Sequence, residues 1–199
     1  MNSGAVLILD KFFSPDGRSV FPVTAIAGDV DIEGTGVVRL AQSSQLAATS
    51  NVTVNSNGNT IRGVVTAGFD LANNSQQIGT LAGTGTVALG SGSLTITAAS
   101  TFAGTITDGS FGTGGNLILD LTDSTGIVAL SGTNTYTGLT LITAGTLQPQ
   151  SATAIPSAHS WPSIPMAPWI STAMTWLLAP SVMGCPVARA GRFYWEQTP

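Results

Sequence analysis

One stretch of the sequence, residues 127–148, limits the choice of fold more than any other. It reads IVALSGTNTYTGLTLITAGTLQ, so two short runs of alternating apolar residues flank a corner rich in glycine, asparagine and threonine. Looser versions of this pattern recur upstream. Recurrence of this kind indicates a repeat architecture, in which each unit packs mainly against its neighbours.

The chain before this stretch also consists of short β-type runs. Apolar residues do not persist at helical spacing, and β-branched residues dominate. Glycine and asparagine turns separate the runs, for example at residues 57–59, 83–85 and 112–115. The expected strands are residues 6–9, 19–26, 30–32, 37–40, 52–54, 60–65, 86–89, 94–97, 116–121 and 127–130.

The composition excludes two classes of protein. Only 8% of residues are charged, whereas the apolar fraction is an ordinary 43%. Disordered chains are usually rich in charge and poor in valine, isoleucine and leucine, so the repeat region is not of that class. The net charge is −4, and no lysine or arginine lies between Arg62 and Arg189. Such a chain offers nothing to hold phosphates, which argues against nucleic-acid binding.

Two all-β architectures compete for these short strands. A sandwich needs long return connections and usually carries exposed lysine and glutamate. A β-solenoid stacks each strand on its counterpart in the next coil, so outward positions can be threonine and serine, and corner asparagines can form ladders. The charge-poor composition, rich in threonine, asparagine and glycine, favours the solenoid.

Two segments resemble one known family. Residues 130–138, LSGTNTYTG, followed by Thr140 and by AGTLQ at residues 144–148, look like the autotransporter-associated β-strand repeat, with Leu139 where that repeat usually has glycine. The DL at residues 70–71 and the IGTLAGTG at residues 78–85 are similar to another segment of the family. The resemblance covers residues 69–148. It implies a right-handed parallel β-helix in the passenger domain of a Gram-negative surface protein, which is secreted through an outer-membrane barrel.

The sequence divides into three parts. Residues 1–24 are expected to be an irregular or edge segment, and residues 25–148 the solenoid repeats. Residues 149–199 form a tail of different composition, which we expect to be disordered or poorly packed. This tail contains all four tryptophans (Trp161, Trp169, Trp176 and Trp195), the single histidine, the single cysteine and eight of the ten prolines.

A change of reading frame accounts for the tail. When residues 193–199 are decoded one base out of register, the codons force Leu-Leu-Gly and permit Ala/Thr, Asn/Asp and Thr after it. This string matches residues 130–135 at all positions but the serine. We therefore expect a frameshift between about Ser157 and Trp161. An alternative is a membrane anchor at residues 166–183, but Pro168 and Pro180 interrupt it.

The acidic residues are the candidates for a catalytic or metal site. Asp29, Asp31 and Glu33 alternate, so a strand would place all three carboxylates on one face, where they could bind Ca²⁺ or act as an acid/base pair. The simpler interpretation is a solvated strand face. Asp120 and Asp123 are expected to form turns. We therefore predict no catalytic, cofactor-binding or metal-binding residue.

The repeat motif itself suggests structural roles. Asn134 and Tyr136 are expected to form corner ladders and stacks between coils, although an exposed tyrosine could contact a glycan. Glycines at tight or positive-φ corners are expected at Gly132, Gly138 and Gly145. His159 and Cys185 have no sequence partners for a metal site or a nucleophile pair.

These observations predict a non-enzymatic structural or adhesin-like passenger fragment, with at most an unknown glycan or host-surface ligand. The resemblance implies a cell-surface location, and contact with a membrane only through a barrel that this chain lacks. No basic segment precedes the apolar residues 5–9, so either the protein is cytosolic or its true start lies upstream. Two alternatives remain: a β-helix enzyme that cleaves polysaccharides, or a degraded reading frame without function. Residues 63–148 offer the enzyme only Asp70, Asp108, Asp120 and Asp123, with no lysine or arginine.

Overall fold

The computed structural model describes residues 6–9, 24–61, 64–156, 187–189 and 192–194, and every regular element among them is a β-strand. No helix in this part of the chain could cross a membrane, and the expected anchor at residues 166–183 lies outside it. The strands are β1 (Val6–Leu9), β2 (Val30–Ile32), β3 (Val37–Leu40), β4 (Val52–Val54), β5 (Asn59–Ile61), β6 (Val64–Thr66), β7 (Phe69–Asp70), β8 (Gln76–Ile78), β9 (Leu81–Gly83), β10 (Thr86–Ala88), β11 (Ser93–Ile96), β12 (Ser100–Phe102), β13 (Thr105–Thr107), β14 (Asn116–Asp120), β15 (Ile127–Leu130), β16 (Thr140–Ala144), β17 (Thr146–Pro149), β18 (Val187–Arg189) and β19 (Arg192–Tyr194).

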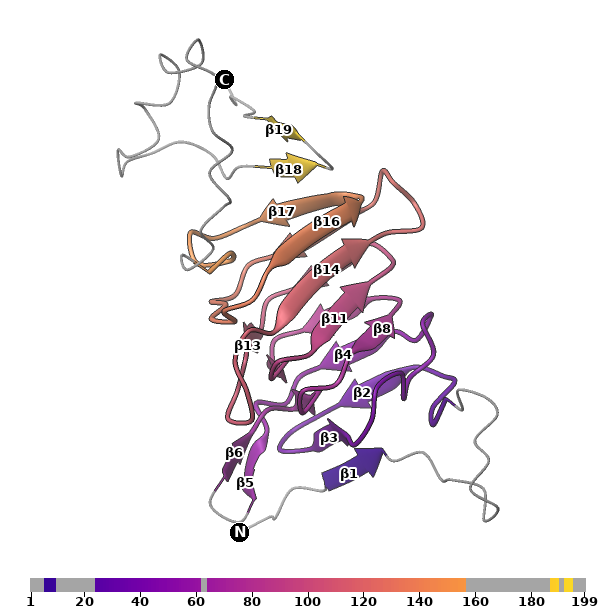
Figure 1. Ribbon diagram of the computed structural model, residues 1–199, viewed down its shortest axis with the longest axis vertical. Coiled ribbons are helices and arrows are strands. Elements are labelled where there is room, and N and C mark those ends of the chain that lie inside the picture. The colour runs from indigo at the N-terminus through magenta and orange to yellow at the C-terminus, as the bar shows by residue number, and fades with distance from the viewer. Residues whose placement is uncertain (1–5, 10–23, 62–63, 157–186, 190–191, 195–199) are drawn as a thin grey trace.

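Three parallel sheets form the body of the protein. Sheet 1 has the order β2-β4-β9-β12-β15-β17, sheet 2 the order β1-β3-β7-β10-β13, and sheet 3 the order β8-β11-β14-β16. The chain visits the three sheets in turn, as in β9, β10 and β11 and then β12, β13 and β14, so each coil lies on the previous one (Figure 1). Hydrogen bonds between adjacent coils join residues that are distant in the chain, such as Thr97 and Ile78, 19 positions apart, and Thr80 and Asn51, 29 positions apart. The predicted all-β, solenoid-like architecture is confirmed.

The interior consists of columns of apolar side chains, because strand alternation sends every second residue inward. Register aligns the columns from coil to coil, so most buried side chains pack on the equivalent ones of the neighbouring coils. The column of sheet 2 is Val38, Phe69, Val87 and Ile106. The columns of the other two sheets are Val30, Val52, Leu81, Ser100, Val128 and Leu147 in sheet 1, and Ile78, Ile96, Leu119 and Ile142 in sheet 3.

A column of glycines forms the corner between sheets 1 and 2. A Cβ atom at Gly85 would overlap the carbonyl oxygen of Ser56, one at Gly104 that of Gly85, and one at Gly132 that of Gly104. The backbones of successive coils therefore touch at this corner, which leaves room only for hydrogen. The Gly-Thr pairs that make the repeat visible in the sequence mark this contact. Gly138 and Gly145 also occupy tight corners, and Gly145 has a φ of 92°.

Two regions differ from the sequence-based expectation. The single strand predicted at residues 60–65 is wrong, since β5 and β6 pair there as an antiparallel hairpin. The stack also continues past residue 148, because β17 extends to Pro149 and Ala154 is fully buried in the core. Beyond it, β18 pairs antiparallel with β17 and with β19. β1 is the edge strand of sheet 2. The rest of the tail and most of the strand expected at residues 19–26 lie outside the described residues.

Candidate functional site

The acidic row of β2 lies on one outward face, as its alternation predicted. Asp29, Asp31 and Glu33 are exposed, whereas Val30 and Ile32 between them are buried. Two of the three carboxylates are used within the fold. Asp29 Oδ1 accepts the Asn51 backbone N–H at 2.9 Å, and Glu33 Oε1 accepts Asn55 Nδ2 at 2.9 Å.

From these carboxylates, two series of polar hydrogen bonds run from coil to coil, one at the amino-terminal ends and one at the carboxyl-terminal ends of the strands of sheet 1. Asn51 Oδ1 accepts a hydrogen bond from the Thr80 hydroxyl at 2.8 Å, and Asn55 Oδ1 accepts the Thr84 backbone N–H at 3.3 Å. The hydrogen bonds from Asn51 hold the pKa of Asp29 below its usual value, which favours a permanent carboxylate over a general acid. Within the described ranges, no three His, Cys, Asp or Glu side chains gather to hold a metal ion.

The structure also brings Arg39 and Asp70 together, a pair that the sequence reasoning missed. The two residues face each other in register across β3 and β7, and Arg39 Nε lies 3.6 Å from Asp70 Oδ2. Asp70 is 1% exposed. Burial raises the pKa of Asp70, against the opposing effects of the Ala72 backbone N–H and Arg39. The only available signal was strand register, because Arg39 lies outside the motif-bearing residues 69–148.

The other three acids that an enzyme could use do not form a pair with Asp70. Asp108 is buried and accepts hydrogen bonds from the backbone N–H groups of Gly114, Gly115 and Thr137 and from the Thr137 hydroxyl. Asp123 accepts hydrogen bonds from the backbone N–H and the hydroxyl of Thr125, which confirms the predicted role of Asp123 in a turn. The same two hydrogen bonds lower the pKa of Asp123. Asp120 is exposed at the end of β14.

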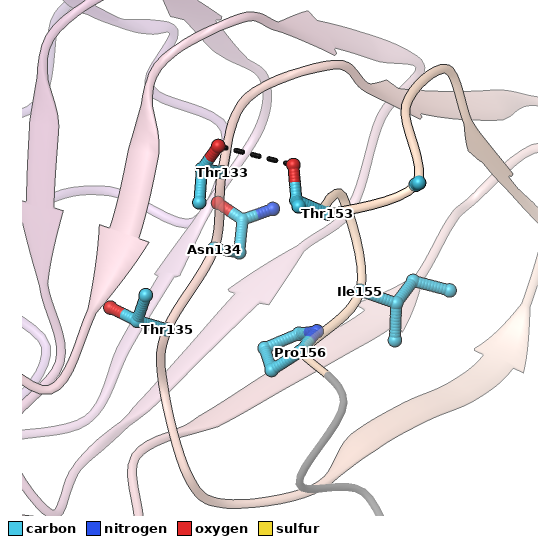
Figure 2. Close-up of a pocket in the computed structure, with 7 residues that line it drawn as sticks. Thr133, Asn134, Thr135, Thr153, Ile155 and Pro156 are labelled. Atoms are coloured by element: carbon cyan, nitrogen blue, oxygen red, sulfur yellow. Dashed lines mark hydrogen bonds between the residues drawn. The ribbon is translucent and has the colours of Figure 1, made fainter.

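An open pocket of about 240 Å³ lies between residues 133–135 and residues 152–156. Figure 2 shows Thr133, Asn134 and Thr135 on one side and Thr153, Ile155 and Pro156 on the other. The hydroxyls of Thr133 and Thr153 are 3.1 Å apart and bond to each other. No lining residue carries a charge. The pocket therefore lacks the groups for acid/base or metal chemistry.

Asn134, beside this pocket, links three coils. Its Oδ1 accepts the Ile106 backbone N–H at 2.8 Å from the coil below, and its Nδ2 donates to the Ala154 carbonyl at 2.6 Å in the coil above. The side chain is buried, so these bonds are protected from water. Asn134 therefore links neighbouring coils, but not through the predicted ladder of asparagine side chains. Its partners are backbone groups, not other asparagine side chains.

Tyr136 is a core residue. It is fully buried, and its hydroxyl lies 2.7 Å from the Thr140 hydroxyl. The alternative role in glycan contact, which required an exposed tyrosine, is therefore wrong.

Burial of Tyr136 predicts a loss of stability at high pH. Desolvation raises its pKa from 10.0 to about 12, although the hydrogen bond with Thr140 opposes the shift. Between these values the unfolded chain loses the phenolic proton while the folded chain keeps it. The free energy of unfolding should thus fall as the pH rises from 10 towards 12, by up to about 1.4 kcal/mol per pH unit from this group. Urea unfolding across this range should show the fall, and Tyr136→Phe should lack it.

Comparisons of the chain with protein-family models, with curated proteins and with solved structures give no match. The fold by itself defines the class as an all-β, solenoid-like protein with three parallel sheets. His159 and Cys185 lie outside the described residues.

Proposed function

We propose that this chain is a non-enzymatic structural segment of a surface-displayed protein, with its coils wound as a right-handed parallel β-helix. The single observation that carries the proposal is the use of the repeat motif. Gly132 touches the coil below, Asn134 bonds to the coils on both sides, and Tyr136 fills the core. The residues that most resemble the autotransporter-associated repeat thus hold one coil on the next, as expected of a stalk.

The distribution of charge supports the same function. A polysaccharide-cleaving enzyme needs two acids, or an acid and a base, that reach one substrate from the surface. Asp70 is buried beside Arg39, and Asp108 is occupied by three backbone N–H groups and a hydroxyl. Asp29 and Glu33 are hydrogen-bonded to the neighbouring coil. Stacked coils instead provide length and stiffness, and loops between strands would carry any binding.

Display of the full chain on bacteria tests this proposal. The chain is fused between a secretion signal and an outer-membrane translocation barrel, and intact cells are treated with protease. We expect a protease-resistant fragment at the surface that includes residues 24–156. Retention of the fusion inside the cell, or its complete digestion at the surface, would contradict a role as a displayed stalk.

The same cells distinguish a stalk from an enzyme. Incubated with a panel of acidic and neutral polysaccharides, they should release no more reducing ends than cells that display the barrel alone. Release that disappears in the Asp29→Asn/Asp31→Asn/Glu33→Gln variant would overturn the non-enzymatic assignment and identify the exposed acidic row as the site.

A further inference from the structure

The middle of one row of residues on the outer face of sheet 2 is buried, although its position should expose it to solvent, and the two ends of the row, Arg39 and Thr107, are partly exposed. Register places Arg39, Asp70, Ala88 and Thr107 side by side, opposite in orientation to the inward column that begins at Val38. Asp70 is 1% exposed and Ala88 is 3% exposed. Because outward residues of a single sheet are buried only when another segment covers them, part of the chain must lie over this face.

The covering segment is the loop that follows β13. Gly109 lies so close to Ala88 that a Cβ atom on it would be 2.8 Å from the Ala88 Cβ. Gly112 packs against the Asn73 side chain and the Ser91 backbone N–H in the corners of two earlier coils. Figure 1 shows the loop leaving β13 and running towards the N-terminal strands. Residues 109–112 thus cross sheet 2 against the direction of the stack.

The part of the loop that is farthest from β13 is held by the ring of Phe111, which stacks on Arg39 of β3. The guanidinium carbon of Arg39 lies 3.9 Å from the centre of the Phe111 ring, a distance typical of a cation–π contact. Arg39 is the only basic residue within residues 24–61 and 64–156. It contacts buried Asp70 and Phe111 together, so the ring lies against the guanidinium of the ion pair.

The near end of the loop is held by Asp108. This carboxylate accepts the backbone N–H groups of Gly114 and Gly115, which closes the loop on itself, and two hydrogen bonds from Thr137 in the next coil. Hydrogen bonds to a charged, buried acceptor are stronger than those between neutral groups. Both ends of the loop are therefore fixed, one to β3 and one beyond β13.

We propose that residues 109–112 form a strap that closes over sheet 2 and makes the coils of β3, β7, β10 and β13 open and unfold as one unit. Coils of a solenoid ordinarily contact only their nearest neighbours, so each end can fray separately. The strap adds a contact between strands three positions apart in the sheet order, Arg39 in β3 and the segment that follows β13. It thereby protects the N-terminal coils, which would otherwise open first.

Amide hydrogen exchange on the full chain tests the strap. In the Phe111→Ala variant, we expect exchange in β3 and β7 to become faster by roughly tenfold, the size of effect that loss of one cation–π contact gives. Exchange in β15, β16 and β17, which lie in the coils beyond that of β13, should not change. Thr113→Ala is the matched control, because Thr113 lies in the same loop with an exposed side chain. Unchanged exchange in β3 and β7, or an equal increase in all coils, would overturn the proposal.

A measurement on the unaltered chain keeps the proposal testable even where Phe111→Ala fails to fold. The ring of Phe111 should shift the NMR signals of the Arg39 side-chain protons upfield and give cross-relaxation with them. The Phe111→Leu variant keeps an apolar cover but has no aromatic ring, so it should abolish the upfield shift and retain part of the protection of β7. Arg39 signals at ordinary positions in the native chain would show that the strap does not close in solution.

Discussion

Replacing Phe102 with alanine should lower the free energy of unfolding by about 3 to 5 kcal/mol, the usual cost of truncating a fully buried phenylalanine. Phe102 is fully buried, and its register partner on the preceding strand of sheet 1 is Gly83, which has no side chain. The ring therefore occupies an interior position that the neighbouring coil leaves open. Alanine cannot fill this position, and the fixed spacing of the strands prevents the coils from collapsing into it.

Urea unfolding followed by circular dichroism measures the change at Phe102, and hydrogen exchange in β12 locates it. Leu139→Ala is the control, because Leu139 is 66% exposed and its truncation should change the free energy by no more than about 0.5 kcal/mol. Equal losses from the two variants would show that the interior columns are not closely packed.

Replacing Gly104 with alanine should lower the free energy of unfolding by about 2 to 3 kcal/mol, although it adds a single methyl group. The new Cβ would overlap the carbonyl oxygen of Gly85 and the end of the Phe102 ring. The backbone oxygen belongs to a strand-to-strand corner that is held by hydrogen bonds, including that from Thr105 N–H to the Gly85 carbonyl at 2.9 Å. The corner must therefore separate, which weakens the contact between two coils.

Gly28→Ala provides a matched control for the glycine column. A Cβ at Gly28 meets no atom within 4 Å, and its backbone is not in the left-handed region. This variant should be neutral or gain up to about 1 kcal/mol, since alanine reduces the entropy of the unfolded chain. A comparable loss at Gly28 and Gly104 would mean that the cost comes from glycine flexibility and not from close approach of the coils.

The two series of polar hydrogen bonds on sheet 1 and the strap on sheet 2 give the two outer faces different roles. On sheet 1, Asp29 and Glu33 bond only to the coil directly above, through Asn51 and Asn55. On sheet 2, Phe111 reaches Arg39 across β7 and β10. The first arrangement strengthens neighbouring contacts one at a time, whereas the second couples coils that do not touch each other. We therefore expect the half of the stack that carries the strap to unfold more cooperatively than the β15–β17 end.

Much of the local structure could be predicted from the sequence. The strands at residues 30–32, 37–40, 52–54 and 127–130 have the predicted bounds, because short runs rich in β-branched and apolar residues, with glycine or asparagine near their ends, define them locally. The hairpin of β5 and β6 was not predicted, because the β-branched residues at 60–65 were assigned to one strand, although Arg62 and Gly63 interrupt them with a turn signal. The buried position of Ala154 was not predicted either, because the proline and serine around it resemble those of the tail.

The candidate sites were less predictable. Alternation alone placed Asp29, Asp31 and Glu33 on one face, but their partners Asn51 and Asn55 are 22 residues away. The pairing of Arg39 with Asp70 and the cover by Phe111 required the stacking register and the path of a loop. No local pattern records such contacts, because loop length between strands varies from coil to coil.

The sequence by itself determined that this protein is all-β, that its strands are short, and that glycines mark the corners, because these properties depend on alternation and on backbone sterics within a few residues. Only the tertiary structure decided which strands stack, which acids are buried, and which outward row is covered. Those outcomes depend on the register between coils and on one loop that crosses several of them, so they arise from contacts between residues that are distant in the chain.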